Sequence, residues 1–278
     1  MATARGLTLL LVLAWPVAVE AQEGYSLVRR TPRELARPLS TDRPDRTESP
    51  YSVPAGWFQL EASAISWSRD REAGASSESL RVAEVNLKAG VLHDVDVQLV
   101  AELWSLDSEQ LRGGTARRGS DGLGLVAARV KVNLWGNDGG RTALALMPYV
   151  GAVRQEGLPG TSRPRHAIAG LIVPFALEAG RGWTLGAMLE FDVANDVPER
   201  WRLTAVQSLT VGRALVGPVR GYAELFHAAG GGLPSAVTLD GGITLPIGAS
   251  VQLDAGVNIG LTAAADDVNP FAGLTLRF

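Results

Sequence analysis

The sequence predicts an all-β protein: an antiparallel transmembrane β-barrel of about twelve strands, preceded by a signal peptide and an irregular N-terminal arm. Three observations predict this fold class. The chain opens with an export signal, the residues after Trp57 alternate between apolar and polar, and short and long connections alternate along the chain. Apolar runs after the signal stop at about 11 residues, too short for a helix that spans a bilayer. Because only helices and closed barrels satisfy their backbone groups in lipid, these features favour a barrel.

Residues 1–21 are expected to be a secretory signal peptide. Arg5 supplies a positive charge, residues 7–19 are apolar, and Ala21 is a small residue before the expected cleavage at Gln22. The apolar stretch is shorter than the roughly 17 to 25 residues of a spanning helix, and a retained anchor is the alternative interpretation. We therefore expect an exported protein that resides in the bacterial outer membrane.

The composition limits the classes of partner. The chain has 46% hydrophobic residues, 32 Gly, no Cys and a formal net charge of -3. No run of Lys and Arg indicates a nucleic-acid partner, and the lack of Cys excludes a disulfide framework. The expected partners are outer-membrane lipid, the barrel-assembly machinery and a small aromatic or hydrophobic solute.

Residues 22–56 are expected to form an irregular periplasmic arm or plug, and residues 57–278 the barrel. The arm is rich in Pro, Arg, Asp, Ser and Thr, with no sustained period of 2 or 3.6. Alternation begins at Trp57 and continues to Phe278. The sequence therefore predicts one transmembrane domain with an N-terminal extension.

Alternation is clearest in residues 250–261, where Val251 and Leu253 lie on an apolar face and Gln252 and Asp254 on a polar face. The other expected strands are 57–68, 80–92, 95–103, 122–135, 141–153, 166–178, 183–193, 201–212, 218–229, 235–247 and 270–278. A soluble β-sandwich or β-helix also alternates, but its strands would be shorter than these.

Connection lengths support the barrel because outer-membrane barrels join short periplasmic turns with longer external loops. The tight connections are expected at 93–94, 136–140, 179–181, 215–217 and 248–249. The longer connections are expected at 69–79, 107–120, 154–165, 195–200, 230–234 and 262–269. An even number of strands places both ends of the barrel on the side of the short turns, in the periplasm.

The last residues, from Leu274 to Phe278, form an alternating strand with a terminal aromatic residue. This ending resembles the signal that the outer-membrane assembly machinery recognises, so Phe278 is the expected assembly signal. Other aromatic residues cluster near strand ends, as in a membrane girdle. Strict alternation would nevertheless place Trp67, Trp104 and Trp135 on the polar face.

Two segments resemble a known family. Residues 40–61, STDRPDRTESPYSVPAGWFQLE, are similar to the opening segment of the outer-membrane transporter-like β-barrel family named for the MetA pathway of phenol degradation. Residues 253–261, LDAGVNIGL, and 266–274, DDVNPFAGL, are similar to its closing hairpin. The resemblance implies a barrel and, through the family's name, export or uptake linked to aromatic compounds.

The arm ends in a segment that alternates acids and bases around a proline. Its charged residues, the gate candidates, are Asp42, Arg43, Asp45, Arg46 and Glu48. They can pair with each other or with charges on the barrel wall. One interpretation is a small plug or gate at the periplasmic mouth, and the other is a clamp that pins the first strand against the last.

The polar faces of the strands place charges of both signs inside the barrel. The lumen candidates are Glu61, Glu84, Lys88, Asp96, Glu102, Arg129, Lys131, Glu190, Asp192, Arg202, Arg220, Glu224, Asp240, Asp254 and Arg277. These charges either line a narrow pore or pair across the lumen and close it. Mixed signs argue against strong selectivity for anions or cations and favour neutral or amphipathic small solutes.

Catalytic and metal sites are not expected. The histidines are His93, His166 and His227, and no Ser/His/acid order in the sequence places a nucleophile beside any of them. Without Cys and with few His, a zinc site is not expected, and no cofactor is predicted. The expected function is a porin-like channel for passive passage of small aromatic or hydrophobic solutes. The alternative is a closed structural or adhesive barrel whose external loops bind a partner.

Overall fold

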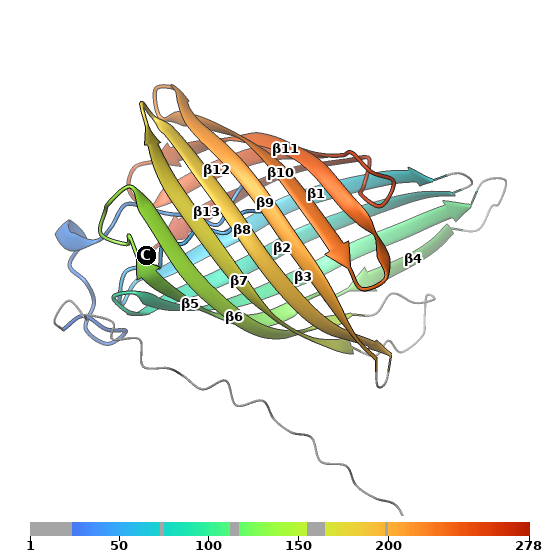
Figure 1. Ribbon diagram of the computed structural model, residues 1–278, viewed down its shortest axis with the longest axis horizontal. Helices are drawn as coiled ribbons and strands as arrows, with labels where there is room; N and C mark the ends of the chain where they lie inside the picture. The colour runs from blue at the N-terminus through green and yellow to red at the C-terminus, as the bar shows by residue number, and fades with distance from the viewer. Residues whose placement is uncertain (1–23, 73–74, 112–116, 155–164, 198–199) are drawn as a thin grey trace, which may run out of the picture.

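The computed structural model describes residues 24–72, 75–111, 117–154, 165–197 and 200–278, and its strands form a single antiparallel sheet closed into a barrel (Figure 1). The expected signal peptide lies outside the described residues. The strands are β1 (Phe58–Glu72), β2 (Ala75–Leu92), β3 (Val95–Leu111), β4 (Arg117–Gly122), β5 (Val126–Trp135), β6 (Thr142–Arg154), β7 (Arg165–Gly180), β8 (Trp183–Val197), β9 (Arg200–Val216), β10 (Val219–Gly230), β11 (Leu233–Ile247), β12 (Val251–Gly260) and β13 (Val268–Arg277). A short 3-10 helix, η1 (Arg33–Leu35), lies in the arm. No helix in the described part of the chain is long and apolar enough to cross a membrane.

The barrel has twelve strand positions, which confirms the predicted architecture. β4 and β5 share one position, because β4 pairs with residues 105–110 of β3 and β5 pairs with residues 95–101 of the same strand. The strand expected at 122–135 is therefore interrupted at 123–125. β1 pairs with β13, and this pairing joins the two ends of the sheet. This closure pairs the first strand of the wall with the last, as a membrane-spanning sheet requires, while β4 pairs with β3 alone among the described strands.

The predicted alternation separates an apolar outer face from a polar inner face. In β12 the side chain of Leu253 is exposed, while that of its neighbour Asp254 is buried. In β3, Asp96 and Gln98 are buried, and Val97 and Leu99, which alternate with them, are exposed. The apolar side chains thus face outward, where lipid would surround them, and the buried polar groups fill the interior.

The structure corrects the predicted orientation of Trp67, Trp104 and Trp135, and register shifts precede Trp67 and Trp135. The register of β1 shifts between Ser63 and Ile65, and that of β5 shifts between Asn133 and Trp135. A one-residue shift moves the following side chains to the other face. After the shift Ser66 and Ser68 are buried around Trp67, and Trp135 is exposed opposite Leu144. Trp104 is likewise exposed beside the buried Ser105. The three tryptophans therefore belong to the outer face.

The short turns agree with the prediction, and so do the long connections at 154–165 and 262–269, but the other long connections are shorter than expected. β1 and β2 continue through most of the predicted loop at 69–79, with Arg69 opposite Glu78, so only residues 73–74 separate them. Strands also continue into the loops predicted at 107–120, 195–200 and 230–234. Beyond the apolar belt both faces of a strand meet water, so the hydrogen-bonded ladder continues without a period-2 pattern.

The arm and the C-terminus lie at the end of the barrel that carries the short turns (Figure 1). At the seam Phe58 and Phe278 exchange two backbone hydrogen bonds of 2.9 Å, and their rings stack with centroids 6.1 Å apart. The last residue is therefore paired with the start of β1, immediately after the arm.

Candidate functional site

The arm enters the barrel, and Asp42 is the centre of its contacts. Lys88 of β2 and Lys131 of β5 both donate to the Asp42 carboxylate, the second at 2.8 Å, and Lys88 also donates to Glu61 of β1 at 2.5 Å. All four side chains are buried. Burial by itself would raise the pKa of Asp42, but the two ammonium groups outweigh it and hold that pKa below its usual value.

The next arm residues reach the opposite wall. Arg43 forms a bidentate pair with Asp254 of β12, at 3.2 and 2.7 Å. Thr47 donates to Glu224 of β10 at 2.5 Å, and Arg129 of β5 donates to Glu48 at 2.6 Å. Because these partners belong to strands on different sides of the barrel, the segment lies across the lumen. It therefore does more than bridge the first and last strands.

Two arm carboxyl groups are held in surroundings that favour the protonated form. Burial raises the pKa of Asp45 to about 8, and the nearby Glu224 adds to the shift. Burial also raises the pKa of Glu48 to about 8, with Asp42 adding to the shift and Arg129 opposing it. Both groups belong to the segment that crosses the lumen, so its charge depends on pH near neutrality.

The segment after the crossing is fixed to the short turns. Val53 donates its backbone N–H to Asp96 at 2.9 Å, and Asn133 donates to the carbonyl of Pro50 at 2.8 Å. Gly90 lies against this segment so closely that a Cβ there would stand 2.0 Å from the carbonyl oxygen of Pro54. The glycine thus permits the close approach of the arm to β2.

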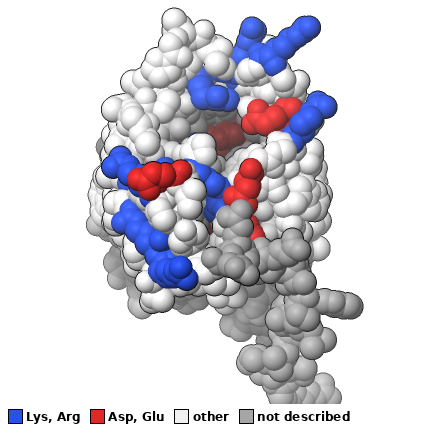
Figure 2. Space-filling view, turned by 90° about the vertical axis from the view of Figure 1, so that its left-hand side faces the viewer, with Lys and Arg blue, Asp and Glu red and all other residues white. Residues whose placement is uncertain are grey.

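A cluster of charged groups ties the start of the arm to the same end. His93, Asp94 and Asp138 lie within 4.8 Å of one another through their ligand atoms. Arg37 of the arm donates to the carbonyl of His93 at 2.8 Å and to Asp138 at 3.3 Å. The ion pair between Arg37 and Asp138 anchors the start of the arm to this turn. Figure 2, which faces this end, shows Lys and Arg around a hollow with acidic atoms inside it.

A cavity of about 780 Å³ lies inside the barrel on the loop side of the arm. The arm residues 42–48 form its floor. Its apolar lining includes Val100, Leu125, Met188, Val206, Phe226 and Phe271. Its charged lining includes Arg43, Arg46, Arg81, Glu84, Glu102, Arg129 and Glu190. The cavity thus has an amphipathic lining, and its floor carries charges of both signs, including the carboxyl groups of Asp42, Asp45 and Glu48.

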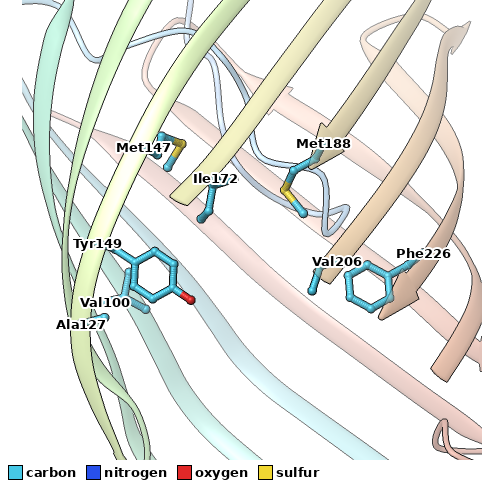
Figure 3. Packing of buried hydrophobic residues seen from close by; sticks show 8 residues of the cluster. All are labelled: Val100, Ala127, Met147, Tyr149, Ile172, Met188, Val206 and Phe226. Atoms are coloured by element: carbon cyan, nitrogen blue, oxygen red, sulfur yellow. The ribbon is translucent and has the colours of Figure 1, made fainter. Parts of the chain in front are cut away.

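The apolar lining continues into a cluster of buried side chains on the inner wall. Figure 3 shows them pointing into the barrel from β3, β5, β6, β7, β8, β9 and β10. The cluster comprises Val100, Ala127, Met147, Tyr149, Ile172, Met188, Val206 and Phe226. Polar side chains are the usual lining of a water-filled barrel, so this stripe is a departure that suits apolar groups of a solute.

Most predicted lumen residues do face the interior. Buried there are Glu61, Lys88, Asp96, Lys131, Glu224, Asp240, Asp254 and Arg277. Facing the cavity are Glu84, Glu102, Arg129 and Glu190. Asp192 accepts a hydrogen bond from Tyr149. Arg202 contacts the carbonyl of Gly231 at the loop end, and Arg220 is exposed near a short turn, so neither belongs to the cavity.

Alternation alone missed several residues of the site. Arg81 and Glu84 both line the cavity although they are three residues apart and would lie on opposite faces of a regular strand. Ala83, between them, has a φ of 56° and breaks the alternation. Tyr149 was missed because β6 is apolar on both faces, so residues 143–153 show no alternation. The absence of alternation in an otherwise alternating barrel was the available signal for the apolar stripe.

Comparisons with known proteins give a family match and several distant structures. A family model described as "Putative MetA-pathway of phenol degradation" matches residues 41–278. No curated protein matches the sequence. The beta domain of the Bordetella autotransporter Brka is 14% identical and covers 79% of this chain and 98% of its own, with a TM-score of 0.49. The translocator domain of autotransporter NalP from Neisseria meningitidis is 9% identical and covers 80% and 88%, with a TM-score of 0.47. An anion-selective porin from Comamonas acidovorans is 10% identical and covers 80% and 98%, with a TM-score of 0.37.

Proposed function

The chain belongs to the family described as "Putative MetA-pathway of phenol degradation", and from this membership we propose that it is an outer-membrane channel for passive passage of small aromatic or hydrophobic solutes. The observation that carries the proposal is the amphipathic cavity of about 780 Å³ inside the barrel. Its volume lies within the range of sites that hold small molecules. An apolar stripe beside charged groups suits a solute with one apolar and one polar end.

The charges of the lumen support passage of solutes that carry little net charge. Arg43, Lys88, Arg129 and Lys131 each pair with a carboxylate, so neither sign dominates the constriction. Selectivity by charge needs a ring of one sign at the narrowest point. A solute would therefore be discriminated by its fit to the cavity and its apolar surface.

The arm is the constriction of the proposed pathway. It forms the floor of the cavity and is held by buried ion pairs to β2, β5 and β12. Passage requires either a gap beside the arm or its displacement. Through this position the arm would set the size of solute that passes.

Two measurements test the channel. Purified protein in planar bilayers is expected to give discrete conductance steps, and proteoliposomes are expected to take up phenol faster than liposomes without protein. The same protein heated above its unfolding temperature before reconstitution serves as the control. A folded protein that neither conducts nor accelerates uptake would refute the channel.

A closed structural or adhesive barrel is the second candidate, and the arm across the lumen is the observation that favours it. Paired charges such as Asp42 with Lys88 and Lys131 are what a sealed interior needs. In that case removal of the arm would create conductance that the intact chain lacks. The intact chain in the same bilayer experiment distinguishes the two functions.

The remaining features of the proposal concern delivery and chemistry. We propose export through the signal peptide at residues 1–21, with cleavage before Gln22, and recognition of the final strand ending in Phe278 by the barrel-assembly machinery. We also propose that the chain is not an enzyme. Its partners would then be outer-membrane lipid, that machinery and the solute.

A further inference from the structure

Arg46 presents an unpaired guanidinium to the cavity. It lines the cavity floor and is exposed there. Among the described residues no carboxylate lies within ion-pair distance of it, and its side chain forms no hydrogen bond. The other cavity arginines differ: they pair with acids as Arg43–Asp254, Arg81–Glu102 and Arg129–Glu48. Arg46 is thus the cavity arginine whose donors are free for a ligand.

Two contacts fix the position of Arg46. Its backbone N–H donates to Glu224 at 2.8 Å, and its guanidinium carbon lies 3.6 Å from the centroid of the Phe226 ring. Stacking on an aromatic face holds the guanidinium plane and leaves the donors at its edge available. A planar fork of this kind matches the two oxygens of a carboxylate.

Three nearby carboxylates, Asp240, Glu224 and Glu84, act on Arg46 through their charge. Glu224 accepts from the backbone of Arg46 and from the hydroxyl of Thr47, and Asp240 accepts from Thr238 at 3.0 Å. Neither they nor Glu84 lies within ion-pair distance of the Arg46 guanidinium, although Oδ1 of Asp240 is buried without a hydrogen-bond partner. Their negative charge weakens the attraction for an anion, which suits a site that must release a solute as well as bind it.

An apolar surface adjoins this fork. Figure 3 shows Met188, Val206 and Phe226 next to one another on the inner wall, all pointing into the barrel. The three side chains are also part of the cavity lining. An anion that carries a flat apolar group could place that group here while its carboxylate meets Arg46. Neither acetate nor phenol could make both contacts.

We propose that Arg46 and Phe226, with the wall of Met188 and Val206, form a binding site for a small aromatic monocarboxylate. The carboxylate accepts two hydrogen bonds from the Arg46 guanidinium, and the ring packs on the apolar wall. The inference rests on the proposed channel, since it names the class of solute that the channel would hold. Such a site would make the cavity prefer aromatic monocarboxylates, a preference that the balanced charges of the lumen do not provide.

Calorimetric titration of the folded full chain in detergent tests the site, with sodium benzoate, sodium acetate, phenol and benzylamine hydrochloride as probes. Benzoate is expected to bind at least roughly tenfold more tightly than each of the other three, because only benzoate offers both a carboxylate and a ring. Equal binding of benzoate and acetate would reduce the site to general charge attraction and overturn the proposal. Stronger binding of phenol or benzylamine than of benzoate would overturn it as well.

Matched variants locate the site. Arg46→Gln is expected to weaken benzoate binding by roughly tenfold or more, whereas Arg81→Gln, which removes the same charge from the same cavity, should change it less than about twofold. Phe226→Ala should weaken benzoate binding more than acetate binding. Equal losses in Arg46→Gln and Arg81→Gln would overturn the assignment. If Arg46→Gln does not fold, Arg46→Lys keeps the charge without the fork and should still weaken benzoate binding.

Conductance and uptake of the same preparations separate this inference from the proposed function. Conductance without preferential binding of benzoate would refute the site and leave the channel. Binding of benzoate that depends on Arg46, in a barrel that neither conducts nor accelerates uptake, would support the site and refute the channel.

Discussion

Single side chains decide whether the arm stays in the lumen, and Asp42 is the most important of them. Its carboxylate is the common partner of Lys88 and Lys131, which are among the most deeply buried side chains of the described barrel. An ammonium group away from water is costly unless it is paired. The two lysines on the wall and the carboxylate on the arm therefore stabilise one another in the interior.

Asp42→Asn is expected to destabilise the folded barrel by about 3 to 5 kcal/mol, because it leaves two buried ammonium groups without their shared carboxylate. Denaturant unfolding in detergent, followed by tryptophan fluorescence, measures this loss. Asp138→Asn is the control, since Asp138 is exposed at a turn and its pairs should contribute less than about 1 kcal/mol. A loss for Asp42→Asn no larger than the control's would show that the lysines find other partners.

Raising the pH is expected to loosen the arm. Released into water, Asp45 would titrate near its usual 3.8, whereas the pKa of the docked group is about 8. The docked arm thus binds more protons than the released arm between these values, so the free energy of docking becomes less favourable as pH rises from about 4 to 8. Glu48 acts in the same direction.

The measurement is single-channel conductance between pH 5 and 9, which should increase with pH. Asp45→Asn should make that increase smaller, because the amide does not titrate. A conductance that falls with rising pH would contradict the predicted sign, and an unchanged slope in Asp45→Asn would remove Asp45 as its source.

At the scale of strands, the sequence predicts the elements well where one face meets lipid and the other does not. The alternation alone predicts β8 and β12, and the predicted bounds of both agree with the structure to within a few residues. The prediction failed at the outer ends of β1 and β2, where polar residues occupy both faces. It also failed at the bulges, because nothing in the identity of residues such as Ala83 specifies a φ of 56°.

The same limit explains which parts of the site were predictable. Charged residues such as Glu224 and Asp254 stand out on alternating strands, so their inward orientation follows from the pattern. The pairing of Arg43 with Asp254 joins residues 211 positions apart, and no local pattern specifies it. Long-range pairs become visible only once the closed barrel fixes the distance between its walls.

The contact of the arm with β2 gives a prediction at this scale. Gly90→Ala should displace the arm, because a Cβ at that position would meet the Pro54 carbonyl at 2.0 Å. Limited proteolysis of the folded protein should then cleave residues 40–56 faster than in the original chain. Gly241→Ala is the control, since its nearest neighbour in the Cβ direction is 3.5 Å away. Identical cleavage rates for the two variants would show that the arm accommodates the methyl group.

For the whole molecule, the proposed channel raises the question of whether the arm is stationary or moves when solute passes. The chain has no Cys, so a new pair of thiols reports on one contact alone. The hydroxyl oxygens of Thr47 and Ser208 lie 2.6 Å apart, which makes Thr47→Cys with Ser208→Cys a suitable pair for a disulfide between the arm and β9. The crosslink would hold the arm across the lumen.

Oxidation of this double variant is expected to slow solute uptake, and reduction should restore it, because the cavity ends at the arm. Uptake in proteoliposomes with and without dithiothreitol provides the measurement. Thr47→Cys alone controls for loss of the hydroxyl and for effects of the reductant. Equal uptake in the two redox states, with the crosslink confirmed by mass spectrometry, would mean that solute passes beside a fixed arm.

The seam between β1 and β13 has a consequence for how the molecule is made. The arm precedes β1 and lies inside the wall, while β13 ends the chain and seals that wall by pairing with β1. A finished cylinder would have to admit a charged segment through its mouth, against the desolvation of each charge. It is simpler for the hairpins to assemble around the segment first, so that Lys88 and Lys131 are neutralised while the wall is still open. The arm would then be enclosed as the wall closes around it, and would not need to enter the barrel through its mouth.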